Sequence, residues 1–409
     1  MSCHFNQSDN PLPKIISSME SKFSDVVRNP KKHKLQILYT QIDRGGANEP
    51  TFKTYSFGLD TNNYFYPASA IKLPIAVLAI EKANLLKEIN VHNRFEIDSG
   101  SVYKMGVLVS PDSKSGYPSI AHSIRKMFVV SDNNSSNYMY DFLGRDYINK
   151  RLWDIGFKSV RMRHRLSLQL NEKENKSTSP ITFYEDSKIL HHQQSRFAQL
   201  PLDVNTKNLL IGKKHYVGKK KKIGPLDFRN KNFMDLNDQH ELIKRIIFPE
   251  TYQADKRFNL SDDDLSLLRR EMSILPRQSD YPRYAEYDKY YDGYCKFFMF
   301  GDTKQEIPNH IKIYNKIGLA YGFALDNAYI VDINNNIEFF LTAVLYSNSN
   351  EVMNDNMYDY ESICSTQKAY NGVAIAYKNQ KKIGNIDLNN LNKHSTKNVN
   401  YLYLQTFPL

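Results

Sequence analysis

The chain has 409 residues, of which 41% are hydrophobic and 12% aromatic, so it can bury a sizeable core and is not disordered by composition. Its net charge of +11 fits an acidic partner or surface, and equally a lysine- and asparagine-rich proteome. No uncharged apolar run reaches about 18 residues, which argues against a transmembrane helix, and the three cysteines show neither metal-site spacing nor a disulfide framework.

The first residues lack the apolar stretch of a signal peptide, which by itself favours the cytoplasm. A second interpretation is that Cys3 begins a mature lipoprotein whose leader is absent, with residues 1–12 as a polar tether. The sequence alone leaves both open.

The N-terminal third predicts an α+β arrangement. Residues 13–27 carry apolar side chains at helical spacing, whereas residues 34–43 and 51–59 alternate like two strands joined at Gly45-Gly46. An apolar helix is then expected to begin near Ser69.

Ser69 and Lys72 are spaced three residues apart, so on a helix they share one face. A neutral lysine amine can accept the proton of a serine hydroxyl, and burial or a nearby cation favours the neutral amine. The alternative to a catalytic pair is an ordinary polar pair on a helix or loop. Ser-x-x-Lys is a weak signal by itself, because it occurs three more times, at Ser101, Ser123 and Ser365.

Two helices are predicted over residues 120–130 and 135–143, with Ser131-Asp132-Asn133 between them. Ser, Asp and Asn are good helix-capping residues, so a cap is the structural alternative to a functional role. Residues 157–180 follow as a polar, irregular segment that predicts a long surface loop.

Residues 185–290 form a separate compositional zone. Two helices are expected there, over 233–248 and 260–275, together with a basic cluster at Lys213–His215 and Lys219–Lys222. Such a cluster can bind nucleic acid or lipid headgroups, but it has no interleaved aromatic residues, so a solvated loop is favoured and no nucleic acid is expected.

The C-terminal part predicts mostly strands. A strand-like aromatic run covers 294–300, and three further strands, an antiparallel meander, are expected at 311–318, 327–333 and 337–346. A helix over 362–377 is expected to cover the meander, before a polar extension at 378–409.

Three stretches now stand in one order: Ser69-x-x-Lys72, Ser131-Asp132-Asn133 and Lys316-Ile317-Gly318. Ser-x-x-Lys, Ser-Asp-Asn and Lys-Thr-Gly are the signature of class A β-lactamases and penicillin-binding proteins, and the chain resembles that family. The segment from Arg165 to Glu172, continuing through Thr178-Ser179-Pro180, is also similar to the family's Ω-loop.

The resemblance implies an α/β (α+β) sandwich, with an antiparallel sheet flanked by helices plus an all-α lobe. The catalytic domain is then expected over residues 13–377, interrupted by a helical and basic insertion at about 185–290.

The resemblance also implies a reaction through an acyl-serine intermediate. Ser69 attacks a β-lactam carbonyl, Lys72 acts as base, Ser131 relays the proton to the departing nitrogen, Lys316 holds charge, and Asn133 binds the substrate amide. The remaining implied contacts, near the oxyanion and substrate, are Ser167, Gly318 and Leu319.

Three positions depart from the family pattern. Ser167 stands where class A enzymes carry the deacylating glutamate, so slow deacylation is expected. Ile317 replaces the threonine of Lys-Thr-Gly, removing a hydroxyl that contacts a substrate carboxylate, and Arg165 has no matching aspartate near Lys176-Ser177.

The prediction is therefore a β-lactamase-like serine hydrolase without metal or cofactor. It is expected to be a monomer in the periplasm or cell envelope, lipid-anchored at Cys3, acting on a β-lactam or peptidoglycan-like substrate. Two alternatives remain: a D-alanyl peptidase, esterase or penicillin-binding acyl-transfer enzyme on the same fold, and a non-catalytic surface binding module.

Overall fold

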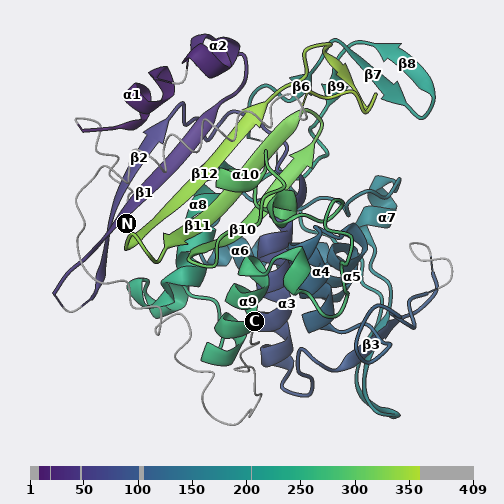
Figure 1. Ribbon diagram of the computed structural model, residues 1–409. Helices are drawn as coiled ribbons and strands as arrows, with labels where there is room; N and C mark the ends of the chain where they lie inside the picture. The colour runs from purple at the N-terminus through teal and green to yellow at the C-terminus, as the bar shows by residue number, and fades with distance from the viewer. Residues whose placement is uncertain (1–8, 19, 47, 101–105, 204, 360–409) are drawn as a thin grey trace.

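The computed structural model describes residues 9–18, 20–46, 48–100, 106–203 and 205–359 (Figure 1). Cys3, Cys364, the helix expected over 362–377 and the extension from residue 378 lie outside the described residues.

A five-stranded antiparallel sheet in the order β10-β11-β12-β1-β2 forms the centre of the molecule. Its strands are β1 (Gln36–Arg44), β2 (Pro50–Phe57), β10 (Ile311–Ala320), β11 (Phe323–Asp332) and β12 (Ile337–Tyr346). The expected hairpin and three-strand meander are both confirmed. The pairing of Gln36 with Val344 joins them into one sheet across some three hundred residues of sequence.

Both faces of this sheet are covered, because neighbouring residues of β11 enter two different cores. Tyr329 and Val331 pack with the helical lobe, whereas Ala328 and Ile330 pack with the N-terminal helix on the opposite face. This two-sided burial explains why the strand sequences are nearly continuously apolar.

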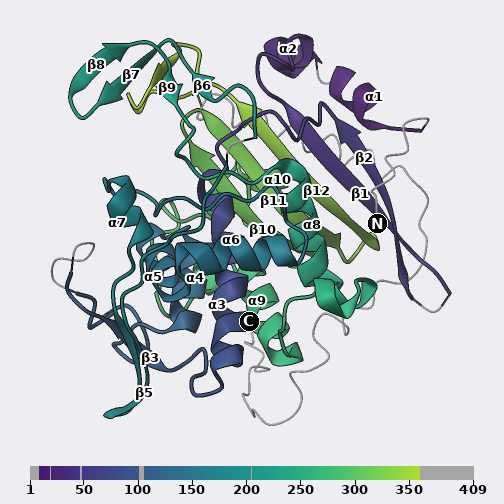
Figure 2. The same cartoon turned by 180° about the vertical axis from the view of Figure 1, so that it is seen from behind.

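One face is covered by α8 (Leu236–Ile247), beyond which lies the helical lobe (Figure 2). His240 of α8 is buried between two sheet hydroxyls, with Nε2 2.7 Å from Thr40 Oγ1 and Nδ1 2.8 Å from Thr342 Oγ1. The lobe comprises α3 (Lys72–Leu86), α4 (Ile120–Val129), α5 (Asn133–Leu143), α6 (Arg145–Asp154) and α9 (Asp262–Ser273).

The other face corrects two sequence predictions. The single helix expected over 13–27 is two helices, α1 (Leu12–Ser17) and α2 (Glu20–Arg28). The strand expected over 294–300 is instead a 3₁₀ turn (Asp292–Cys295) followed by the kinked α10 (Phe297–Phe300). Phe298 is fully buried in the core on this face, so its burial comes from packing across the sheet rather than from strand pairing.

The zone at 185–290 is not one uniform unit. Helices α8 and α9 belong to the main core, while β4 (Ile181–Glu185) and β5 (Lys188–Gln193) pair with β3 (Arg94–Ile97). The remaining short strands are β6 (Leu210–Ile211), β7 (Lys214–Val217), β8 (Lys220–Ile223), β9 (Leu226–Asp227) and, from the C-terminal part, β13 (Val352–Met353).

The basic cluster lies on the β7–β8 hairpin, which projects from the body (Figure 1). All four residues of β8 are exposed, in agreement with the expected solvated surface. None of the described helices is long and apolar enough to cross a membrane.

Candidate active site

Ser69 lies in a 3₁₀ turn, Ala68–Ile71, directly before α3. The apolar residues around it are buried, whereas Ser69 itself is half-buried and faces a cavity. Lys72 is the first residue of α3 and is fully buried, and Pro74 sits in the first turn, where its missing N–H costs no helical hydrogen bond. The turn therefore brings Ser69 to the cavity, while Lys72, three residues later, is buried.

Lys72, Ser131, Asn133 and Lys316 form one hydrogen-bonded network. Lys72 Nζ donates to the backbone oxygen of Ser131, to Asn133 Oδ1 at 2.7 Å and to Ser131 Oγ at 3.2 Å. Lys316 Nζ lies 2.9 Å from the same Ser131 Oγ. The three motifs thus meet, and the Ser131 hydroxyl lies between two lysine amines.

The segment between α4 and α5 serves as a cap and as part of this network at once. Asp132 caps α5 by accepting a hydrogen bond from Ser135 N at 2.7 Å, as the structural alternative predicts. Ser131 has a left-handed backbone, with φ 57°. The cap consequently fixes the position from which Ser131 and Asn133 reach Lys72.

Gly318 allows β10 to approach the turn that carries Ser69. A Cβ atom at this position would lie 2.5 Å from the Pro67 carbonyl oxygen and 2.9 Å from the Leu325 side chain. Only a residue without a side chain fits between these groups. The next residue, Leu319, is 42% exposed and lines the same cavity as Ser69.

The cavity has a volume of about 970 Å³. Ser69, Asn133, Ser167 and Leu319 all line it, so four of the predicted site residues share one space. Aromatic and basic residues also line it: Tyr66, His164, Arg165, Tyr216, Lys231, Tyr321 and Tyr358. Among the described residues that line this cavity, none is Asp or Glu.

The buried amines have altered proton affinities. Burial, followed by the charge of Lys316, lowers the pKa of Lys72 well below its ordinary value. Burial also lowers the pKa of Lys316 to about 8, although Cys295 and Asp326 oppose the shift. The network therefore favours a neutral Lys72 next to a Lys316 that is largely protonated at neutral pH.

Sequence reasoning missed a second buried polar group behind Lys316. Lys296 Nζ donates to Asn315 Oδ1 at 2.7 Å, and Asn315 Nδ2 donates to Asp326 Oδ1 at 2.8 Å. Burial lowers the pKa of Lys296 to about 8. No spacing in the sequence joins these residues, since their contact depends on how the 292–300 segment packs against β10 and β11.

The loop before α7 (Glu172–Lys176) holds Ser167 at the cavity, where Ser167 Oγ accepts a hydrogen bond from Asn133 Nδ2 at 2.8 Å. The glutamates nearby have other roles. Glu174 forms a capping box with Asn171, and Glu172 pairs with Lys176 at 3.2 Å while 61% exposed. Neither carboxylate therefore takes the place of the glutamate that Ser167 replaces.

Arg165 does have a carboxylate partner, which sequence comparison within the loop could not find. Its Nη2 and Nε lie 2.7 and 2.9 Å from the two oxygens of Asp141 on α5, and both side chains are completely buried. The expected loss of an anchoring aspartate is thus compensated from a helix outside the loop.

Four non-glycine residues at or beside the cavity have left-handed backbone conformations. They are Ala68 (φ 47°), Ser131 (φ 57°), Ser167 (φ 56°) and Tyr321 (φ 54°). Each such residue costs of the order of 1 kcal/mol or more, and such strain is concentrated at functional sites. Within the described part of the chain there is no group of three or more His, Cys, Asp or Glu side chains placed to hold a metal ion.

Part of the chain is similar to a known protein family, and the fold is similar to that of solved structures. The model of the beta-lactamase enzyme family matches residues 18–195, which include Ser69, Lys72, Ser131 and Asn133. Similar solved structures include a class A beta-lactamase from Mycobacterium abscessus, at 13% identity over 90% of this chain and 99% of that chain, with a TM-score of 0.48. A beta-lactamase from Burkholderia ambifaria is 11% identical over 88% of this chain and 98% of that chain, also with a TM-score of 0.48. No curated protein sequence matches.

The family match covers two of the three motifs, and the fold brings the third, on β10, to the same network. Residues 18–195 are thus similar to the beta-lactamase enzyme family, and this part of the chain carries Ser69, Lys72, Ser131 and Asn133.

Proposed function

We propose that the chain opens β-lactam rings of the class A type through an acyl-serine intermediate on Ser69. The observation that carries the proposal is the network in which Lys72 and Lys316 both contact Ser131 at the mouth of the Ser69 turn. A serine hydroxyl is a weak nucleophile, and a neighbouring unprotonated amine supplies the base that it needs.

In the proposed acylation, Lys72 takes the proton of Ser69 as Oγ bonds to the carbonyl carbon. The backbone N–H groups of Ser69 and Leu319 stabilise the oxyanion. Ser131 then delivers a proton to the ring nitrogen as the C–N bond breaks, and Lys316 orients Ser131 from the other side. The products are a ring-opened amine and an ester on Ser69.

Substrate binding in this proposal uses Asn133, which hydrogen-bonds the side-chain amide of the substrate. Ile317 is buried and offers no hydroxyl, so weaker binding of penicillin-like carboxylates is expected.

Deacylation is proposed to be slow, because hydrolysis of the ester requires a base to activate water. Ser167 is the loop residue at the cavity, and a hydroxyl without a basic partner cannot fill that role. The absence of Asp and Glu from the described lining of the cavity also favours the second candidate, an acyl-transfer or drug-trapping enzyme on the same fold.

Intact-protein mass spectrometry after exposure to a penicillin, a cephalosporin and a fluorophosphonate tests these proposals. A mass increase in the wild type that is absent from Ser69→Ala is expected, and Ser123→Ala, which alters another Ser-x-x-Lys pair, should still be labelled. An adduct that disappears within minutes supports turnover, whereas one that persists supports trapping. A lack of adduct with all three probes would reject the nucleophile and favour the binding-module alternative.

We further propose that residues 13–377 form the catalytic domain and that the protein works as a monomer, anchored to the cell envelope by a lipid on Cys3. Metabolic labelling with palmitate, lost in Cys3→Ser, tests the anchor. Light scattering of the purified protein at a mass near 47.6 kDa tests the monomer.

A further inference from the structure

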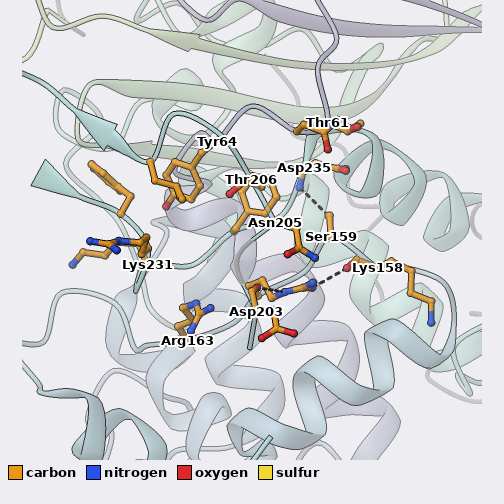
Figure 3. A pocket seen from close by; sticks show the side chains of 16 residues that line it. Thr61, Tyr64, Lys158, Ser159, Arg163, Asp203, Asn205, Thr206, Lys231 and Asp235 are labelled. Atoms are coloured by element: carbon orange, nitrogen blue, oxygen red, sulfur yellow. Dashed lines mark hydrogen bonds between the residues drawn. The ribbon is translucent and has the colours of Figure 1, made fainter. Parts of the chain in front are cut away.

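A second cavity shares Lys231 with the catalytic one and is lined by residues from the segments 61–64, 158–163, 203–209 and 228–235 (Figure 3). Its volume is about 250 Å³. That is several times the volume of a water molecule and below the size of typical drug-binding pockets, so it suits a small ligand.

Several cationic side chains line this cavity without forming an ion pair to another described residue. Arg161, Arg163 and Lys231 line it, and across the described ranges of the chain none of the three forms an ion pair. Burial is the main cause that lowers the pKa of both arginines, and for Arg163 the neighbouring Arg145 and Arg161 lower it further. Positive charge is thus gathered here at an energetic cost that an anion would relieve.

The two acidic residues of the cavity form no ion pair with these cations, although the charges of Asp203 and Asp238 partly oppose the lowering of the Arg161 pKa by burial. Asp203 is exposed, and its contact with Arg161 is made through its backbone oxygen, at 2.9 Å from Nε. Asp235 is buried, and burial raises its pKa to about 7, so it carries less than a full charge near neutral pH. Figure 3 shows Asp235 on the opposite side of the cavity from Arg163 and Lys231.

The two arginines are held in place by backbone carbonyls. Arg161 Nη1 donates to the oxygens of Lys158 and Val160 at 2.8 and 2.7 Å, and Arg163 Nη2 donates to the oxygen of Leu202. These bonds use only some of the N–H groups of each guanidinium. The remaining donors are available in a fixed position, which is what recognition of a tetrahedral anion requires.

Uncharged donors complete the lining. Asn205 and Thr206 line the same cavity as the arginines (Figure 3), whereas the Ser159 hydroxyl already donates to Asp238 at 2.6 Å. Several cations with neutral donors around a small cavity suit a phosphate group better than a carboxylate, because a phosphate carries up to two charges and more acceptor oxygens.

We infer that the cavity bounded by Arg161, Arg163 and Lys231 binds a phosphate group, either as inorganic phosphate or at the end of a small phosphate monoester. The site is separate from the reaction at Ser69, although Lys231 lines both cavities. It does not depend on the proposed β-lactam chemistry.

The test is calorimetric titration of the whole protein with inorganic phosphate, glycerol 3-phosphate and acetate, at one ionic strength kept constant with sodium chloride. Constant ionic strength matters because diffuse attraction to a protein of net charge +11 is screened by salt, whereas a built site is not. Saturable binding of at least one phosphate compound, at least about tenfold tighter than acetate, is expected. The stronger of the two phosphate compounds identifies the source.

Two variants and a matched control locate the binding. Lys231→Gln and Arg163→Gln should each weaken phosphate binding by about tenfold or more, while Lys220→Gln, which removes one exposed charge from β8, should not. The side-chain amine of Lys231 makes no hydrogen bond to another described residue. Lys231→Gln therefore keeps the test valid if loss of the Arg163–Leu202 bond in Arg163→Gln prevents folding.

Three outcomes would overturn the inference. The first is that neither phosphate compound binds saturably, and the second is that Lys231→Gln and Lys220→Gln lose phosphate affinity equally. The third is that Ser69→Ala no longer binds phosphate, which would place the anion in the catalytic cavity instead. Retained phosphate binding in a Ser69→Ala protein that no longer forms an adduct would show that the two sites are independent.

Discussion

Replacing Arg165 by Met should lower the free energy of unfolding far more than a substitution at an exposed position does. Arg165 makes two bonds to Asp141, and its guanidinium also donates to the Glu174 and Ser177 carbonyls at 3.1 and 2.7 Å. Both partners of the ion pair are 0% exposed, so Met leaves a buried carboxylate without its cation. Breaking such a pair costs about 3–5 kcal/mol of unfolding free energy.

A double-mutant cycle separates the pair from the rest of the arginine. Asp141→Asn alone leaves the buried guanidinium without its anion, whereas the double variant removes both charges. We expect the double variant to be about 2 kcal/mol more stable than the sum of the two single losses predicts. The free energies come from urea unfolding followed by circular dichroism.

Lys150→Met is the matched control, because Lys150 pairs with Asp154 at 2.9 Å on the surface, with 69% and 53% of the side chains exposed. Its cost should not exceed about 0.5 kcal/mol. A loss below about 1 kcal/mol for Arg165→Met would refute the claim that Asp141 anchors the Ser167 loop, as would additive effects in the cycle.

Three further predictions concern the catalytic network. The acylation rate should fall as pH rises through about 8, because Lys316 loses its proton there and no longer holds charge beside the Ser131 hydroxyl. In Lys316→Arg that alkaline fall should move to higher pH, since arginine stays protonated; an unchanged profile in stopped-flow acylation would contradict the assignment. Gly318→Ala should lower the free energy of unfolding by about 1–3 kcal/mol and slow acylation, because the new Cβ would meet the Pro67 oxygen. Gly46→Ala, whose Cβ would have nothing within 4 Å, should change neither quantity. Urea unfolding measures the stability of both variants, and stopped-flow acylation measures their rates. Ser167→Glu should shorten the lifetime of the acyl adduct by a factor on the order of 10², because it supplies a base, whereas Ser167→Gln should leave the lifetime unchanged. If time-resolved mass spectrometry gives equal adduct lifetimes for Ser167→Glu and the wild type, a missing base is not what limits deacylation.

The sequence by itself determined the local features of the site. The spacing of Ser69 and Lys72 on an apolar helix, the Ser131–Asn133 link between two helices and the Lys316 strand are all readable from residue type and periodicity. The meander was readable for the same reason, since its three strands are adjacent along the chain and joined by short turns.

Only the tertiary structure decided which distant residues meet. The N-terminal hairpin joins the C-terminal meander through β1 and β12, Asp141 on α5 reaches Arg165, and Lys296 lies behind Lys316. None of these pairs has a fixed spacing, because each depends on how whole elements pack rather than on the period of one helix or strand. The predicted strand at 294–300 was wrong for the same physical reason: an aromatic run is buried equally well across a sheet face as within the sheet, and only packing distinguishes the two.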